Sequence, residues 1–77
     1  MTHYYFNLLD GVRIEDEEGQ ELPDDAAAHA EAMRSARSIM AEAVWTGRLP
    51  LDESIEIVAH GEVVAVLPFT DAIKLPG

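Results

Sequence analysis

The sequence predicts an α+β fold, a two-layer β-β-α-β-β domain in which one long helix packs on one face of a four-stranded sheet made of two hairpins. Two observations predict it. Strand-forming runs occur in pairs, each pair joined at a glycine turn, and one alanine-rich helical segment separates the pairs. The 77 residues are enough for a single small acidic domain, which spans 1–77 with a tail that frays after about residue 73.

The first hairpin is expected near the N-terminus, from strands at 3–9 and 12–16. Residues 3–9 are aromatic and apolar, and apolar and polar residues alternate along 12–16. The dipeptide Asp10-Gly11 between them is a turn signal. Residues 17–23 read as a polar connection that leads to the next element.

A long helix is expected at 25–46. Asp24 or Asp25 can cap its first N–H groups, and Gly47 can supply the left-handed residue that ends it. Its many alanines favour the helical state. The predicted buried stripe consists of Ala26, Met33, Ala36, Met40, Ala43 and Val44, with Ile39 at its edge. The predicted wet face carries Glu31, Arg34, Ser35, Ser38 and Glu42.

The second hairpin is expected from strands at about 54–58 and 62–69, with its turn at His60-Gly61. The strands at 3–9 and 62–69 are the most apolar, so we expect them side by side at the centre of the sheet. A second order, in which the strand at 54–58 lies between them, stays open at this point.

Turn chemistry predicts the register of both hairpins. A three-residue loop that ends in a left-handed glycine pairs Leu8 with Val12 in the first hairpin and Ile57 with Val63 in the second. A two-residue loop in the first hairpin would instead set Leu8 against Arg13. The predicted inner face is Tyr4, Phe6, Leu8, Val12, Ile14, Ile55, Ile57, Val63, Ala65, Leu67 and Phe69. The predicted outer face is Tyr5, Asn7, Arg13, Glu15, Glu56, Val58, Glu62, Val64 and Val66.

Several segments together resemble a known family. They are the Tyr-Tyr-Phe strand before Asp10-Gly11, the run Asp-Glu-Glu-Gly-Gln-Glu-Leu-Pro-Asp at 16–24, the Ala/Arg-rich helix, and Val-Leu-Pro-Phe-Thr-Asp-Ala at 66–72. They are similar to a family of small bacterial proteins, frequent in rhizobia-like α-proteobacteria, that is defined only as a domain of unknown function. The resemblance covers about 3–73. It implies the fold and a bacterial source, and it assigns no site residue.

The charge excludes several classes of partner. Fifteen Asp and Glu against five Lys and Arg leave a net charge of -10, which argues against binding nucleic acid or an anionic membrane surface. No apolar run approaches the ~20 residues that span a bilayer. No signal peptide is recognisable, so we expect a cytoplasmic protein. The chain has no cysteine, which excludes disulfides and cysteine-based zinc sites.

The acidic segment between 15 and 25 is the one place that suggests a metal. Oxygen ligands suit Ca²⁺ or Mg²⁺, and the weak candidates are Asp16, Glu18 and Glu21. The calcium-binding helix–loop–helix frame fails, because placing Gly19 at its glycine position puts Ile14 at the first ligand position. A solvated acidic loop is the preferred interpretation, so we expect no metal and no other cofactor.

No catalytic constellation is recognisable. His3, His29 and His60 are scattered without metal-ligand spacing, and His29 is expected at the boundary of the buried helix face. Ser35 and Ser38 have no histidine one turn away. We also expect so small a domain to lack room for a cleft of ~300 Å³. The sequence therefore favours a protein that is not an enzyme.

The apolar residues that lie outside the predicted core indicate association with another protein chain. Tyr5, Val58, Val64 and Val66 lie on a predicted sheet face that no second helix can cover, so we expect a homodimer or another protein partner there. Trp45 falls away from the buried stripe. Packing on 49–51 is the preferred interpretation, and Trp45 stays a possible interface residue. The predicted function is a protein-interaction or self-associating module. The alternative is a divalent-cation-binding accessory protein that uses the loop at 15–25.

Overall fold

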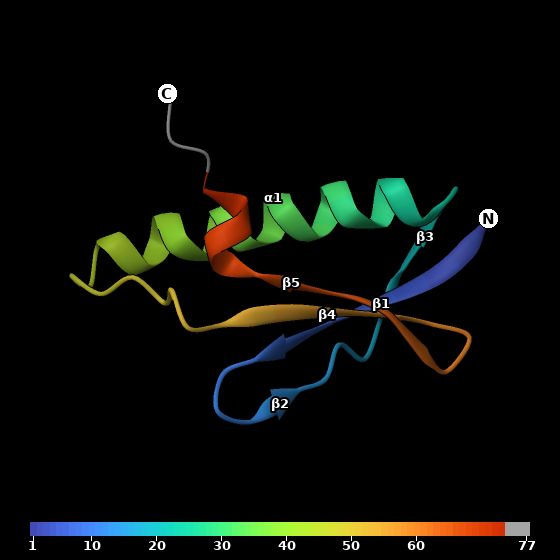
Figure 1. Cartoon of the computed structure of the whole chain (residues 1–77), viewed down its shortest axis with the longest axis horizontal. Helices are drawn as coiled ribbons and strands as arrows, with labels where there is room; N and C mark the ends of the chain where they lie inside the picture. Colours follow the sequence, from blue (N-terminus) through green and yellow to red (C-terminus); the bar gives the residue numbers. More distant parts are fainter. Residues whose placement is uncertain (74–77) are drawn as a thin grey trace.

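The computed structural model describes residues 1–73 and confirms the α+β class, with one helix packed on one face of an antiparallel open sheet (Figure 1). Its elements are β1 (Thr2–Leu9), β2 (Arg13–Ile14), β3 (Gln20–Leu22), α1 (Asp25–Val44), β4 (Ser54–Ala59), β5 (Glu62–Pro68) and the 3₁₀ helix η1 (Phe69–Ala72). The predicted fraying after residue 73 lies outside the described residues.

The strands follow the order β2-β1-β4-β5, and β3 pairs with the first half of β1. The expectation that β1 and β5 are neighbours is therefore wrong, and the order left open is the observed one. β4 lies inside the sheet. Every second residue of β4, namely Ile55, Ile57 and Ala59, points to the inner face and is buried. β5 ends in Pro68, which lacks an N–H group and suits an edge strand.

The loop of the first hairpin has three residues as expected, but it lies one residue further along the chain. Leu8 pairs with Ile14 and Leu9 with Arg13, so the loop is 10–12 and the predicted pairing of Leu8 with Val12 is wrong. The Asp10 N–H donates to the Val12 carbonyl at 2.9 Å, which closes the loop around left-handed Gly11. Val12, predicted on the inner face, is consequently an exposed loop residue.

The second hairpin has a two-residue loop instead of three. His60 and Gly61 both have positive φ, 54° and 74°, the combination of a type I′ turn. Ala59 then pairs with Glu62 and Val58 with Val63, so the predicted pairing of Ile57 with Val63 is wrong. A bulge shifts the register, after which Ile57 lies opposite Ala65 and the inner face is apolar again.

The helix begins at its cap as predicted and buries a different stripe. The Asp24 carboxylate accepts the Ala27 N–H at 2.8 Å. The fully buried side chains are Ala28, Ala32, Ala36 and Met40, a ridge at spacings of four. Ala26 and Val44, predicted as buried, are exposed, whereas Glu31 and Ser35, predicted as wet, are partly buried. Small alanine side chains let α1 approach the sheet closely, and this contact selects the ridge.

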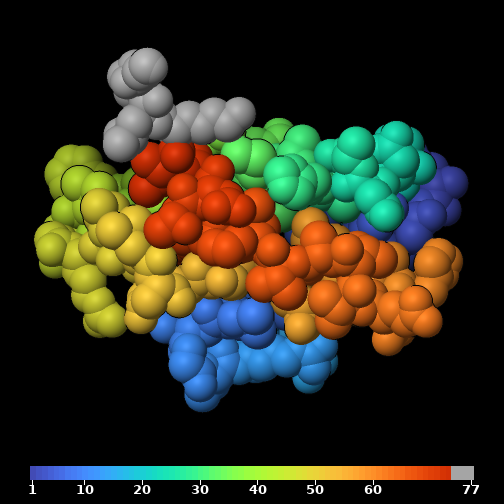
Figure 2. Space-filling view, viewed as in Figure 1, coloured from blue at the N-terminus to red at the C-terminus, as the bar shows by residue number. Residues whose placement is uncertain are grey.

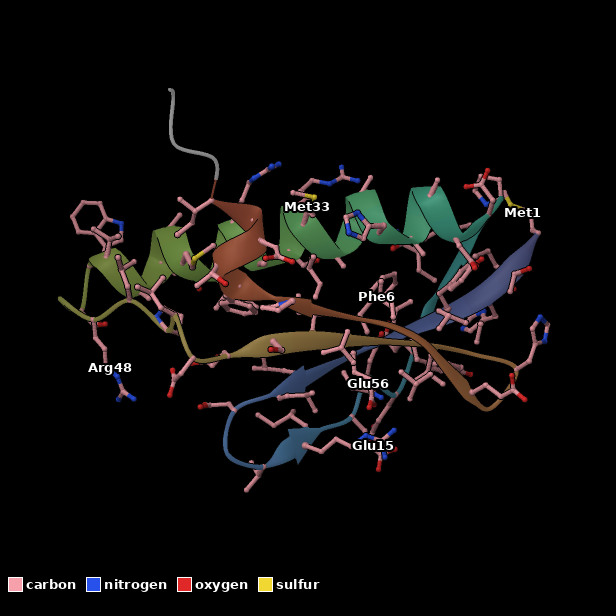
Figure 3. All side chains as sticks on the ribbon, viewed as in Figure 1. Met1, Phe6, Glu15, Met33, Arg48 and Glu56 are labelled. Atoms are coloured by element: carbon pink, nitrogen blue, oxygen red, sulfur yellow. The ribbon has the colours of Figure 1, made fainter. Side chains whose placement is uncertain are left out.

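The core lies between α1 and the inner face of β1, β4 and β5 (Figure 3). Phe6 is partly buried there, and Ile57 and Met40 are buried, which confirms that both hairpins face one unbroken helix. Phe69 was expected within the last strand. It is instead the buried first residue of η1, which packs on α1, and Arg37 Nε donates to the Ala72 carbonyl at 3.0 Å.

Candidate functional site

The outer face of the sheet is not covered by any helix in the part of the chain that the structure describes (Figure 1). Tyr5, Val58 and Val63 lie side by side across β1, β4 and β5. Val63, Val64 and Val66 are 53%, 41% and 50% exposed. We call Tyr5, Val58, Val63, Val64 and Val66 the valine patch. It gathers the four sheet residues predicted for an interface.

Val63 is the patch residue that the sequence analysis missed. It was placed on the inner face because a three-residue loop had been expected. The shorter turn reverses its orientation relative to Ile57, and the bulge then returns Ala65 and Leu67 to the inner face. The adjacent His60-Gly61 dipeptide was the available signal, since both residue types tolerate the positive φ of a type I′ turn.

A polar network lies beside the valine patch on the same face (Figure 3). The buried Asn7 side chain donates from Nδ2 to Glu56 Oε1 at 3.0 Å, and Arg13 Nε donates to the same oxygen at 2.9 Å. The Asp16 N–H donates to Asn7 Oδ1 at 2.9 Å. The hydrogen bond from Asn7 and the charge of Arg13 hold the pKa of Glu56 below its usual value, although burial opposes this. The negative charge of Glu56 at the centre of the outer face is thus compensated by Arg13.

Asp16, the first of the weak metal candidates, organises the chain between β2 and β3. Its Oδ1 accepts the N–H groups of Glu18 and Gly19 at 3.2 and 3.1 Å, and its Oδ2 accepts that of Phe6 at 3.2 Å. Burial would raise its pKa, but these N–H donors outweigh burial and lower it. Asp16 thereby satisfies the edge of β1 at the point where neither β2 nor β3 pairs with it.

Of the other two metal candidates, Glu21 contacts His3 through its carboxylate, and Glu18 contacts it through its backbone carbonyl. Glu21 Oε1 lies 3.0 Å from His3 Nδ1, and the Glu18 carbonyl lies 2.7 Å from His3 Nε2. These contacts raise the pKa of His3, the Glu21 side chain contributing most. Within residues 1–73 there is no group of three or more histidine or acidic side chains arranged to hold a metal ion.

A groove on the inner face contradicts the expectation that the domain has no room for a cleft. It has a volume of about 380 Å³ and lies between β1 and α1, where Phe6, Leu8 and Ile55 face Glu31, Ser35 and Ile39. The groove exists because α1 packs on β4, β5 and η1, which leaves the β1 side of the inner face beside the helix.

Trp45 and His29 differ from their predicted environments. Trp45 is 91% exposed and does not pack on 49–51, since Leu49 and Leu51 are exposed too. Trp45 follows the last residue of α1, in the layer opposite the outer sheet face, so it does not join the valine patch. His29 is exposed on α1 rather than at a buried boundary. Ser35, predicted on the wet face of the helix, is partly buried and lines the groove, whereas Ser38 is exposed as predicted.

Together these features define a small α+β domain with one helix, an uncovered sheet face and a groove beside the helix. The chain belongs to the family described as Domain of unknown function (DUF6894), whose model matches residues 3–70. This confirms the resemblance to a family of unknown function, while the bacterial source stays a prediction. Searches of curated proteins and of solved structures found no match. Within residues 1–73, no helix has both the length and the apolar character needed to cross a membrane.

Proposed function

We propose that this protein is a non-enzymatic interaction module that forms a homodimer through the outer face of its sheet. The observation that supports this is the valine patch, in which exposed branched side chains of β5 continue the row formed by Tyr5 and Val58. Exposed valine on an uncovered sheet is the surface that sheet-on-sheet packing buries. A stable interface buries ~800 Å² per partner, so the contact would extend from the patch over the neighbouring polar network.

The features of β5 favour contact through the face rather than through the strand edge. Pro68 at its end and the bulge near Val63 both interrupt a continuous edge ladder. The Glu56–Arg13 pair keeps uncompensated charge out of the middle of the face. Since each copy carries a net charge of -10, we expect salt to strengthen the association by screening the repulsion.

Sedimentation equilibrium of matched valine variants tests the proposal. Val66→Asp places a charge in the patch and should weaken the dimer at least ~10-fold, equivalent to ~1.4 kcal/mol. Val44→Asp is the control, because Val44 is equally exposed but lies at the end of α1. Glu56→Lys is unsuitable because it would also remove the acceptor of Asn7 and Arg13. A wild-type protein that is monomeric at high micromolar concentration would contradict the proposal.

The alternative, a divalent-cation-binding protein, gains no specific support from the loop at 15–25. Asp16 already accepts three N–H groups, and Glu21 contacts His3. Titration calorimetry with Ca²⁺ and Mg²⁺ discriminates the two functions. Saturable heat below millimolar metal would favour cation binding, and its absence would leave the interaction module as the better proposal.

A further inference from the structure

The groove beside α1 is longer than its central part. The central hollow shares Ile39 with a second hollow of about 200 Å³ that includes Ala43, Thr46 and Arg48. Along the helix the two extend from Glu31 to Ala43, a distance of ~18 Å at 1.5 Å per residue. A groove of this length corresponds to about three turns of a second helix.

The floor of the groove is apolar and incompletely covered. Phe6, Leu8 and Ile39 are only partly buried although they pack against the core. Ile14 pairs directly with Leu8 and therefore extends the same face of the sheet, where it is 50% exposed. The inner face thus carries one helix over β4 and β5, and an apolar strip along β1 and β2 that lacks a helix within the described residues.

The walls of the groove are acidic. Asp16 and Glu31 line the central hollow, and Asp10 and Glu53 line the second, against a single cationic side chain, Arg48. Arg34 pairs with Glu31 at 2.7 Å from a largely exposed position on the helix. Burial, together with the charges of Asp10 and Asp52, raises the pKa of Glu53, which reflects an acidic environment. Because the walls of this groove are acidic, their electrostatic complement is a basic segment and not another carboxylate-rich surface.

We propose that this groove binds a basic amphipathic helix of a partner protein. Its apolar side would rest on Phe6, Leu8 and Ile14. Its Lys or Arg side chains would lie over Glu31 and Asp10, since the Asp16 carboxylate already accepts three N–H groups. The incoming helix would lie beside α1 and complete the helical layer over the inner face of the sheet. The valine patch lies on the opposite face of the sheet, so the inference does not depend on the proposed dimer, although Asp16 also lines a hollow beside Tyr5 and Val58.

Fluorescence anisotropy with two synthetic 16-residue peptides tests the charge match. Both carry leucine at helical spacings of three and four. One has Lys and Arg at its polar positions, and the other has Glu there. We expect the basic peptide to bind at least ~10-fold more tightly than the acidic one. Binding should weaken as NaCl rises from 50 to 300 mM, in rough proportion to the screening of exposed charges. Equal binding of both peptides would overturn the proposal.

Two serine variants locate the binding. Ser35→Arg places a long cationic side chain in the groove, whereas Ser38→Arg makes the same change on the exposed side of the same helix. We expect loss of peptide binding only in Ser35→Arg, and a roughly threefold loss in the milder Glu31→Gln. Circular dichroism establishes that each variant is folded. Peptide binding that survives Ser35→Arg in a folded protein would overturn the proposal.

A third outcome separates this inference from the proposed dimer. If Ser35→Arg abolishes self-association while Val66→Asp leaves it intact, the groove is occupied by a second copy. Both proposals would then be wrong. If Val66→Asp has no effect because the wild type is monomeric, only the proposed dimer fails, and the peptide result stands by itself.

Discussion

Of the four glycines within the described residues, Gly19 is the one at which an added side chain would clash with neighbouring atoms. Its φ is 69°, and a Cβ atom there would meet the His3 ring and lie 2.7 Å from the Tyr4 carbonyl oxygen. The glycine therefore permits both the turn made by Asp16 and the close approach of β1 and the segment before β3. Neither requirement could be recognised from the sequence, where Gly19 reads as an ordinary turn residue.

We predict that Gly19→Ala destabilises the protein far more than Gly11→Ala. Both glycines have a φ of 69°, so both variants lose ~1–2 kcal/mol to backbone strain, but a Cβ at Gly11 meets nothing within 4 Å. The clash should add ~1–3 kcal/mol at Gly19. Urea unfolding of the two variants measures the difference, and equal midpoints would show that the close approach has no energetic weight.

Glu53 makes stability depend on pH. It is buried, and burial with the nearby charges of Asp10 and Asp52 raises its pKa above the usual 4.5. The folded state therefore binds this proton more tightly than the unfolded state does. The contribution to stability is most favourable below pH 4.5 and is lost as pH rises through the raised pKa.

Glu53→Gln tests this assignment because the amide keeps the shape and cannot ionise. We expect its melting temperature at pH 7 to exceed that of the wild type, because the variant does not have to keep a charged carboxylate buried. The difference should shrink as pH falls toward 4.5. Glu42→Gln, at an exposed position of α1 whose charge does not contribute to the raised pKa of Glu53, is the control. A lower melting temperature for Glu53→Gln would contradict the raised pKa.

At the scale of elements, hydrophobic pattern and turn signals predicted every long segment. Residues 25–46 contain α1, the run at 62–69 contains the whole of β5, and the runs at 3–9 and 54–58 each contain all but one residue of β1 and β4. The three-residue β3 was missed, because Gln20 and Glu21 carry no strand pattern and their order comes from pairing with β1. Periodicity likewise indicated an apolar stripe on α1, but contact with the sheet selected which ridge is buried.

Four of the five members of the valine patch were predictable from the sequence, and the fifth was not. Alternation placed Tyr5, Val58, Val64 and Val66 together on one face, whereas the register of Val63 depended on a bulge that forms only when β4 and β5 pair. The groove could not be foreseen, because it depends on which part of the inner face α1 covers. That choice is a property of packing between segments distant in the sequence.

At the scale of the whole molecule, like charge is spread over a small body. The radius of gyration is 12.6 Å, while the net charge is -10. In 10 mM salt the screening length is ~30 Å, longer than the molecule's radius, and it falls below ~8 Å near 0.2 M. Repulsion between carboxylates therefore acts across the entire fold at low salt.

We predict that the melting temperature rises as NaCl increases from 10 mM to 0.2 M. Screening removes repulsion in the compact state more than it weakens the three ion pairs found within residues 1–73, each of which has one partner at least half exposed. Differential scanning calorimetry at fixed pH measures the trend. Sodium sulfate at equal ionic strength separates screening from surface exclusion. A flat profile would mean that the charges are locally compensated.

The amino-acid sequence alone determined the fold class, the long capped helix, the two hairpins and the acidity, because these depend on local propensity, periodicity and composition. Tertiary structure alone decided the central place of β4, the type I′ turn and bulge, the buried alanine ridge and the groove between α1 and β1. The physical reason is that each of these is a choice among several apolar contacts of similar strength. Packing of the whole chain selects the one that buries the most surface with satisfied backbone groups.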